Sequence, residues 1–254
     1  MKTIKDDKEA MRDLYGKVLV SGLRDKELKS YFLSASLKGQ SYNMGRMMAF
    51  SPGWLENQSI WMHMAYKYYL QLIRSGLYEE FFSEMRGGGI LPYMDPVKYG
   101  RSLMQCSSFL ASSAFPDPMQ HGRGFEARLS GSTAEFLDMW RIMFIGNNPF
   151  IMKNGELYFQ LIPALPIWLF VDEEEMAIPA EPTEAVTLSF KLFADIDVIY
   201  HNSEWTNLYG VAPKSYMITY KDGSTSIVEG SLVGPADALA IRKVHTVESV
   251  DAYF

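Results

Sequence analysis

The sequence predicts an α+β protein whose helices come first and whose strands follow. Up to about residue 150, apolar residues recur at the three- and four-residue spacing of amphipathic helices. From about residue 154 onward, apolar and polar residues alternate instead, as they do from Val186 to Leu192. Asp222-Gly223 between two such runs is a strong β-hairpin signal. We therefore predict an α-helical domain over residues 1–150 and a β domain over residues 151–254.

The composition of the 254 residues is typical of a packed globular chain, with 48% hydrophobic, 14% aromatic and 21% charged residues. A net charge of −6 gives no electrostatic reason to expect nucleic acid or an anionic membrane as a partner. The single cysteine, Cys106, excludes an intramolecular disulfide and fits a reducing compartment. The first residues are too polar for a signal peptide, and no apolar run is long enough to span a membrane. We therefore expect a cytoplasmic protein.

Hydrophobic periodicity predicts five helices in the first half of the chain. They are expected at Lys5–Leu19, Glu27–Leu37, Glu56–Ser75, Leu77–Met85 and Ser132–Ile145. The central one, from Glu56 to Ser75, follows a Pro52-Gly53 turn and is apolar nearly all round, which predicts a buried helix. It carries His63, a polar group that needs a partner in a dry interior.

Alternation predicts the strands of the second half. They are expected at Glu156–Ile162, Val186–Leu192, Ile196–Tyr200, Tyr216–Tyr220 and Thr225–Val228. In the first half, Gln105–Gly124 is rich in Ser, Pro, Asp and Gly and is expected to be a long ordered loop.

One set of polar residues could form an anion site. The hydroxyls of Ser132 and Thr133, with the N–H groups at a helix start, would bind an anion, and His63 with Arg123 or Arg128 would complete the site. Other roles remain open, because His63 could be a core histidine, Ser132 and Thr133 only a helix cap, and Arg123 a surface residue. The histidines and the cysteine are too scattered for a metal site.

Carboxylates for acid–base chemistry on a glycoside are also available. The spacing does not choose among Glu56, Asp95, Asp117, Glu126, Glu135 and Asp138. The Gly-rich run at Arg86–Tyr93 lacks the Lys-Ser/Thr ending of a phosphate-binding loop, so a nucleotide site is not expected there.

Two segments resemble a known family. Pro52-Gly53-x-x-Glu56-Asn57-x-x-Ile60-x-x-His63 is similar to the PG-x-x-EN-G-G-I-F-x-H segment of the cellobiose and chitobiose phosphorylases. The later motif is Gly122-Arg123-Gly124 followed by Arg128-Leu129-Ser130-Gly131-Ser132 and Ala134, and it resembles the G-x-G…W-L-T-G-T-A segment of that family. The order and separation of the two segments fit as well, and the resemblance is best from about Gly45 to Phe170.

The resemblance implies the end of an (α/α)6 barrel, built from helical hairpins, followed by an antiparallel jelly-roll-like β-sandwich segment. Family members cleave a β-linked disaccharide or short oligosaccharide with inorganic phosphate and invert the anomeric centre, releasing a sugar 1-phosphate. By this resemblance His63 and Ser132 bind phosphate, with Thr133 and Arg123 beside them, and Glu56 and Asn57 contact the sugar. Phosphate is then a co-substrate, and no cofactor is expected.

The chain departs from the family at three places. Gln58-Ser59 replaces a glycine pair, and LSGSTA has one more residue than L-T-G-T-A, so that either Ser132 or Thr133 could hold the anion. The family's catalytic aspartate lies upstream of the part that this chain resembles. We therefore expect a C-terminal portion whose partner is the missing upstream barrel or a homodimer partner. The alternatives are an inverting glycoside hydrolase on the same barrel and a non-catalytic carbohydrate-binding or structural fragment.

Overall fold

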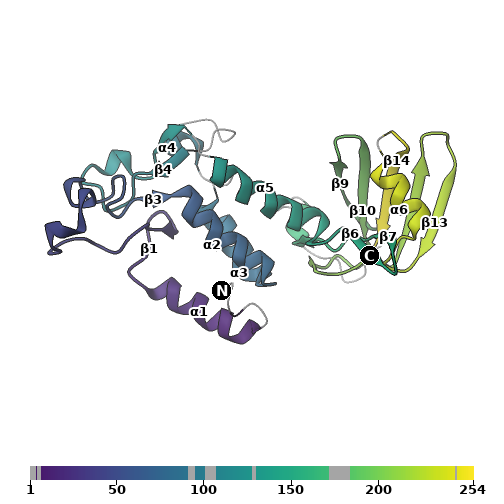
Figure 1. The fold of residues 1–254 in the computed structure, drawn as a ribbon, viewed down its shortest axis with the longest axis horizontal. Coiled ribbons are helices and arrows are strands. Elements are labelled where there is room, and N and C mark those ends of the chain that lie inside the picture. The colour runs from purple at the N-terminus through teal and green to yellow at the C-terminus, as the bar shows by residue number, and fades with distance from the viewer. Residues whose placement is uncertain are drawn as a thin grey trace. The chain divides into compact units, whose positions relative to one another are not determined.

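The computed structural model describes residues 4, 7–90, 95–100, 107–127, 130–171, 184–243 and 245–254, with the backbone alone for Ala127, Ser130 and Gly131 (Figure 1). Both helices and sheets are present, which confirms the α+β prediction. The chain forms two compact units, unit 1 (Met1–Trp140) and unit 2 (Arg141–Phe254). None of the helices in the described ranges has the length and apolar character needed to cross a membrane.

Unit 1 holds most of the helices. They are α1 (Lys8–Val20), α2 (Met62–Arg74), α3 (Tyr78–Glu84), α4 (Pro96–Tyr99) and α5 (Ser130–Ile145), the last of which runs into unit 2. The Asp7 carboxylate caps α1 by accepting the N–H of Ala10 at 2.9 Å. Helices α2 and α3 pack against each other across a short turn in which Gly76 has a φ of +70°, so the predicted helix pair is confirmed.

The predicted helix at Glu27–Leu37 is wrong. A short hairpin of β1 (Arg24–Asp25) and β2 (Ser30–Tyr31) occupies this region instead. The buried Asp25 carboxylate accepts the N–H groups of Glu27 and Leu28 through one oxygen and that of Ser113 through the other. These side-chain bonds compete with helical hydrogen bonding and hold a turn.

Helix α2 begins at Met62, six residues later than the predicted start at Glu56. Residues 51–58 form a compact turn, in which the N–H of Gly53 donates to the carbonyl of Asn57 at 2.8 Å. Leu55 and Gln58 have φ values of +45° and +60°, which no right-handed helix allows. The prediction of burial on all sides is also wrong, since Met64 is 50% exposed and Lys67 faces solvent.

A three-stranded sheet sets the position of α2 and α5. Its strands are β3 (Ile60–Trp61), β4 (Ser107–Leu110) and β5 (Gly124–Ala127), in the order β3-β4-β5. Strand β4 lies where a loop was expected, and β3 lies within the range predicted as the central helix. Both outer strands are antiparallel to β4, so they run in the same direction. Because α2 follows β3 directly and α5 starts three residues after β5, both helices begin at the same end of this sheet.

Unit 2 is organised around a five-stranded sheet of order β13-β12-β14-β10-β9. Its strands are β9 (Val186–Leu192), β10 (Ile196–Asn202), β12 (Ser215–Tyr220), β13 (Thr225–Glu229) and β14 (Val247–Tyr253). The hairpin predicted at Asp222-Gly223 is confirmed, because β12 and β13 pair across it. The prediction of antiparallel strands is wrong for one pair, β10 and β14, which run parallel because a connection that includes α6 (Pro235–Arg242) separates them.

Smaller elements cover the apolar face of this sheet. They are the hairpin of β6 (Phe150–Lys153) and β7 (Glu156–Phe159), the pair β8 (Ala164–Leu165) and β11 (Leu208–Tyr209), and α6. The hydroxyl of the buried Tyr216 accepts the N–H of Leu161 at 3.1 Å, and that of Tyr200 donates to the carbonyl of Phe144. These bonds satisfy the polar tips of two large core side chains.

Candidate functional site

His63 lies in the first turn of α2 and faces α5. Its Nε2 is 3.6 Å from Oε2 of Glu135, and the two side chains are 31% and 16% exposed. Oε2 of Glu135 is buried and accepts no hydrogen bond from the described residues, so the imidazole is its nearest charge partner. The histidine ring therefore lies against the N-terminal part of α5.

Ser132 and Thr133 lie in the first turn of α5, on the same helix as Glu135. The predicted capping role of Ser132 is wrong, because α5 already begins at Ser130. Ser132 is 1% exposed, whereas Thr133 is partly exposed. Of the two hydroxyls, that of Thr133 is therefore the more accessible to a ligand. The first turn of a helix also offers backbone N–H groups that attract anions.

Glu56 and Asn57 lie in the turn before β3. The Glu56 carboxylate forms an ion pair with Arg46, and the Asn57 amide donates to the carbonyl of Phe50 at 2.7 Å. Asn57 is only 6% exposed, so it mainly holds the turn together. Glu56 keeps an accessible side chain, 24% exposed, in a charge pair that a ligand could share.

Arg123 is not brought to His63 by this sheet. Arg123 immediately precedes β5 and so lies where this strand starts. Helix α2, which carries His63, begins at the opposite end of the sheet, where β3 and β5 end. The Arg123 side chain is exposed and lies beside Gly100, where an added Cβ would be 3.4 Å from Nε of the arginine. The alternative arginine of the predicted site, Arg128, lies outside the described residues.

A cleft of about 300 Å³ extends from Glu135, the partner of His63, along α2 and α5. Its lining residues are Lys67, Leu70, Gln71, Arg74, Ala134, Glu135 and Asp138. Arg74 forms an ion pair with Asp138, while Lys67 is exposed and has no carboxylate partner in the described part of the chain. The cleft can therefore hold a polar ligand that accepts hydrogen bonds from cations.

Sequence reasoning found His63 but missed Lys67 and Arg74, the cations that line this cleft. His63, Lys67 and Arg74 recur at helical spacing, which places them along one side of α2. That signal is readable in the sequence, but it gains meaning only when α5 is known to lie alongside. Among the described residues, no cluster of three or more histidine, cysteine and acidic side chains could hold a metal ion.

Comparison with models of protein families finds no match to this chain, and comparison with curated proteins finds none either. The geometry of the site therefore carries the functional argument.

Proposed function

We propose that this chain is the C-terminal, phosphate-binding portion of a glycoside phosphorylase-like enzyme. In this reaction a phosphate oxygen attacks the anomeric carbon of a β-linked di- or oligosaccharide, and the bond to the leaving sugar oxygen breaks. A carboxylic acid protonates that oxygen. The family resemblance assigns this acid to a barrel portion upstream of the resembling part.

The observation that carries the proposal is the convergence of His63 with the start of α5. The two helices begin at the same end of the β3-β4-β5 sheet, and Glu135 of α5 lies 3.6 Å from the histidine ring. A histidine, a threonine hydroxyl and helix N–H groups are a suitable donor set for phosphate. In the proposed site His63 and Thr133 donate to the phosphate, and Lys67 adds positive charge beside it.

The turn before α2 gives independent support. Gln58 stands where the family has the first of two glycines, and its φ is +60°. Glycine adopts this conformation without strain, whereas other residues are disfavoured there. The backbone at residue 58 thus has the conformation that a glycine would favour, although the side chain differs.

The proposal extends to the architecture. We infer that the packed pair α2–α3 is a helical hairpin of an (α/α)6 barrel, and that the sheet of unit 2 with its covering hairpins corresponds to the jelly-roll-like segment. The supporting observations are the short α2–α3 connection and, in unit 2, the two two-stranded sheets that accompany the five-stranded one.

The direct test is phosphate-dependent release of sugar 1-phosphate from a panel of β-linked disaccharides. The assay is run on this chain with and without the polypeptide encoded upstream. His63→Ala is assayed in parallel, and His245→Ala is the control because the His245 side chain is 77% exposed. We expect product that requires phosphate, the upstream polypeptide and His63. Product without phosphate would instead indicate the inverting hydrolase, and no product with the upstream polypeptide would leave only a binding or structural role.

A second test uses this chain alone. Isothermal titration with inorganic phosphate should detect binding that His63→Gln and Thr133→Val each weaken by roughly tenfold, the effect of one charge-assisted or buried hydrogen bond. His245→Gln should leave the affinity unchanged. Equal affinity in all four proteins would reject the proposed phosphate site.

A further inference from the structure

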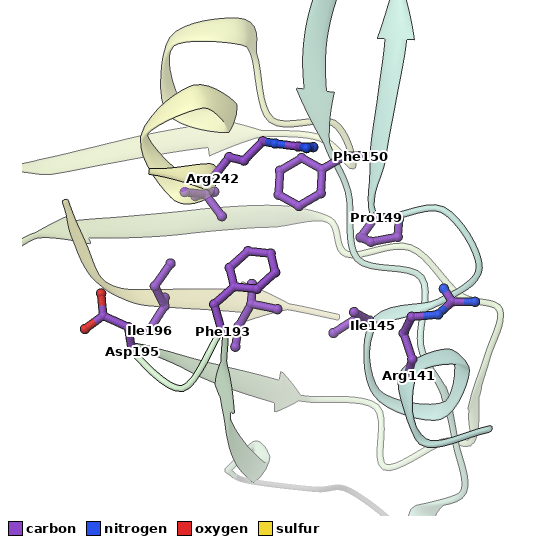
Figure 2. Close-up of a pocket in the computed structure, with 10 residues that line it drawn as sticks. Arg141, Ile145, Pro149, Phe150, Phe193, Asp195, Ile196 and Arg242 are labelled. Atoms are coloured by element: carbon purple, nitrogen blue, oxygen red, sulfur yellow. The ribbon is translucent and has the colours of Figure 1, made fainter. Parts of the chain in front are cut away.

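Unit 2 contains a cavity of about 470 Å³ that is separate from the site in unit 1 (Figure 2). This volume lies within the range of small-molecule sites. Its lining consists of seven apolar and three charged side chains: Ile145, Pro149, Phe150, Leu192, Phe193, Ile196, Ile241, Arg141, Asp195 and Arg242. Leu192, Ile196 and Ile241 belong to the buried core, whereas Phe193 is 56% exposed. The cavity thus has an apolar floor and an accessible aromatic wall.

Two aromatic rings form that wall. Phe150 and Phe193 are nearly parallel, with 18° between their planes and 6.2 Å between their centroids. The guanidinium carbon of Arg242 lies 5.4 Å from the centroid of the Phe150 ring. Figure 2 shows Phe150 between Arg242 and Phe193. A flat apolar group packed beside these rings would therefore lie within reach of a positive charge.

The charges around the cavity do not cancel. The Asp195 carboxylate accepts hydrogen bonds from Nζ of Lys221 at 2.7 Å and from the N–H of His245 at 2.9 Å, so both of its oxygens are already satisfied. Arg141 is fixed by bonds from Nη1 to the carbonyls of Gly146 and Asn147, each 2.8 Å long. Arg242 has no carboxylate partner among the described residues, so its guanidinium remains beside a carboxylate that is neutralised by its own partners.

We propose that this cavity binds a small organic anion with a flat aromatic body and one carboxylate or phosphate group. The aromatic body packs against Phe193 and the apolar floor, and the anionic group pairs with Arg242 at the rim. The inference is independent of the proposed phosphorolysis, since it uses different residues in a different unit.

The test is calorimetric titration of the whole chain with 2-naphthoate and with its neutral isostere 2-naphthamide. We expect naphthoate to bind about tenfold more tightly than the amide, as one charge-assisted hydrogen bond implies. Arg242→Gln should remove this preference by weakening naphthoate alone. The matched control is Lys243→Gln, which removes the neighbouring exposed cation outside the cavity and should have no effect. Phe193→Ala should weaken both ligands.

Several results would overturn the proposal. Equal binding of the two ligands, absence of binding, or unchanged naphthoate affinity in Arg242→Gln would each exclude an anion site. A dimer that Phe193→Ala converts into a monomer, seen by sedimentation, would assign the cavity to a second copy of the chain. Because the substituted side chains are exposed, circular dichroism should show every variant folded.

Discussion

Nε2 of His63 and Oε2 of Glu135 lie 3.6 Å apart, on helices far separated in the sequence. An ion pair between Arg74 and Asp138 joins the same two helices further along the cleft. Lys67 lies between the two pairs on α2 and lacks such a partner among the described residues. The two pairs thus fix the width of the cleft, while Lys67 supplies its accessible charge.

The first prediction concerns the coupling of His63 and Glu135. His63→Ala leaves the partly buried Glu135 carboxylate without its charge partner, so the free energy of unfolding should fall by about 1 kcal/mol. In a Glu135→Gln background the same substitution should have less effect, giving a coupling energy of roughly 0.5–1 kcal/mol. A double-mutant cycle by denaturant unfolding measures it. Purely additive effects would mean that the contact does not orient the ring.

The second prediction separates crowding from backbone strain at Gly53. An added Cβ would lie 2.3 Å from the backbone nitrogen of Phe115, and Gly53 has a φ of +81°. Gly39 in the same unit has a φ of +79° but nothing within 4 Å. Gly39→Ala should therefore destabilise the chain by about 1 kcal/mol through strain, and Gly53→Ala by roughly 3 kcal/mol or more. Equal effects on the unfolding free energy would show that Phe115 moves aside freely.

The third prediction tests the glycine-like conformation at residue 58. Gln58→Gly should be neutral or stabilising by up to about 1 kcal/mol, because it relieves the backbone strain of a φ of +60°. The hydrogen bonds between the backbone of residue 58 and the hydroxyls of Ser34 and Ser112 are kept. Gln71→Gly, within the last turn of α2, should instead destabilise by up to about 1 kcal/mol. Thermal unfolding of the two variants gives the comparison. A loss of stability in Gln58→Gly would remove this support for the family resemblance.

Most of the sheet in unit 2 was predictable from the sequence, because the alternation in β9, β10, β12 and β13 reflects one buried and one accessible face. Strand β14 was not predicted because polar and apolar residues do not alternate along it. Its sequence, VESVDAY, carries polar residues on both faces, and Asp251 is only 8% exposed. That carboxylate is held by His201 at 2.8 Å, a contact between distant segments that no local pattern reveals.

In unit 1 the four helices α1, α2, α3 and α5 were predictable, whereas the connections between them were not. The Asp25 carboxylate and the positive φ values at Leu55 and Gln58 override local helical periodicity. Of the expected site residues, His63, Ser132 and Thr133 lie on the two helices that the Glu135 contact brings together. Arg123 lies toward the other end of the sheet, because strand register, which the sequence does not display, decides its position.

The last prediction concerns acid stability at Glu27. His121 has Nδ1 3.2 Å from both carboxylate oxygens of Glu27 and Nε2 2.8 Å from the carbonyl of Phe115, and Lys98 also bonds to Glu27. Burial raises the pKa of Glu27, but the hydrogen bonds from His121 and Lys98 lower it more, so the net shift is downward. The folded pKa is thus below the unfolded value of about 4.3, and folding favours the carboxylate form.

This contribution should be fully present above about pH 4.3 and disappear as the pH falls through the lower folded pKa. At pH 7 the chain should therefore melt roughly 1–3 °C above Glu27→Gln, and the difference should vanish toward about pH 3. Glu229→Gln, at an exposed carboxylate on strand β13 without an ion pair among the described residues, is the control and should show no such pH-dependent difference. If the unsubstituted chain still melted above Glu27→Gln at low pH, packing rather than the charge pair would stabilise this junction.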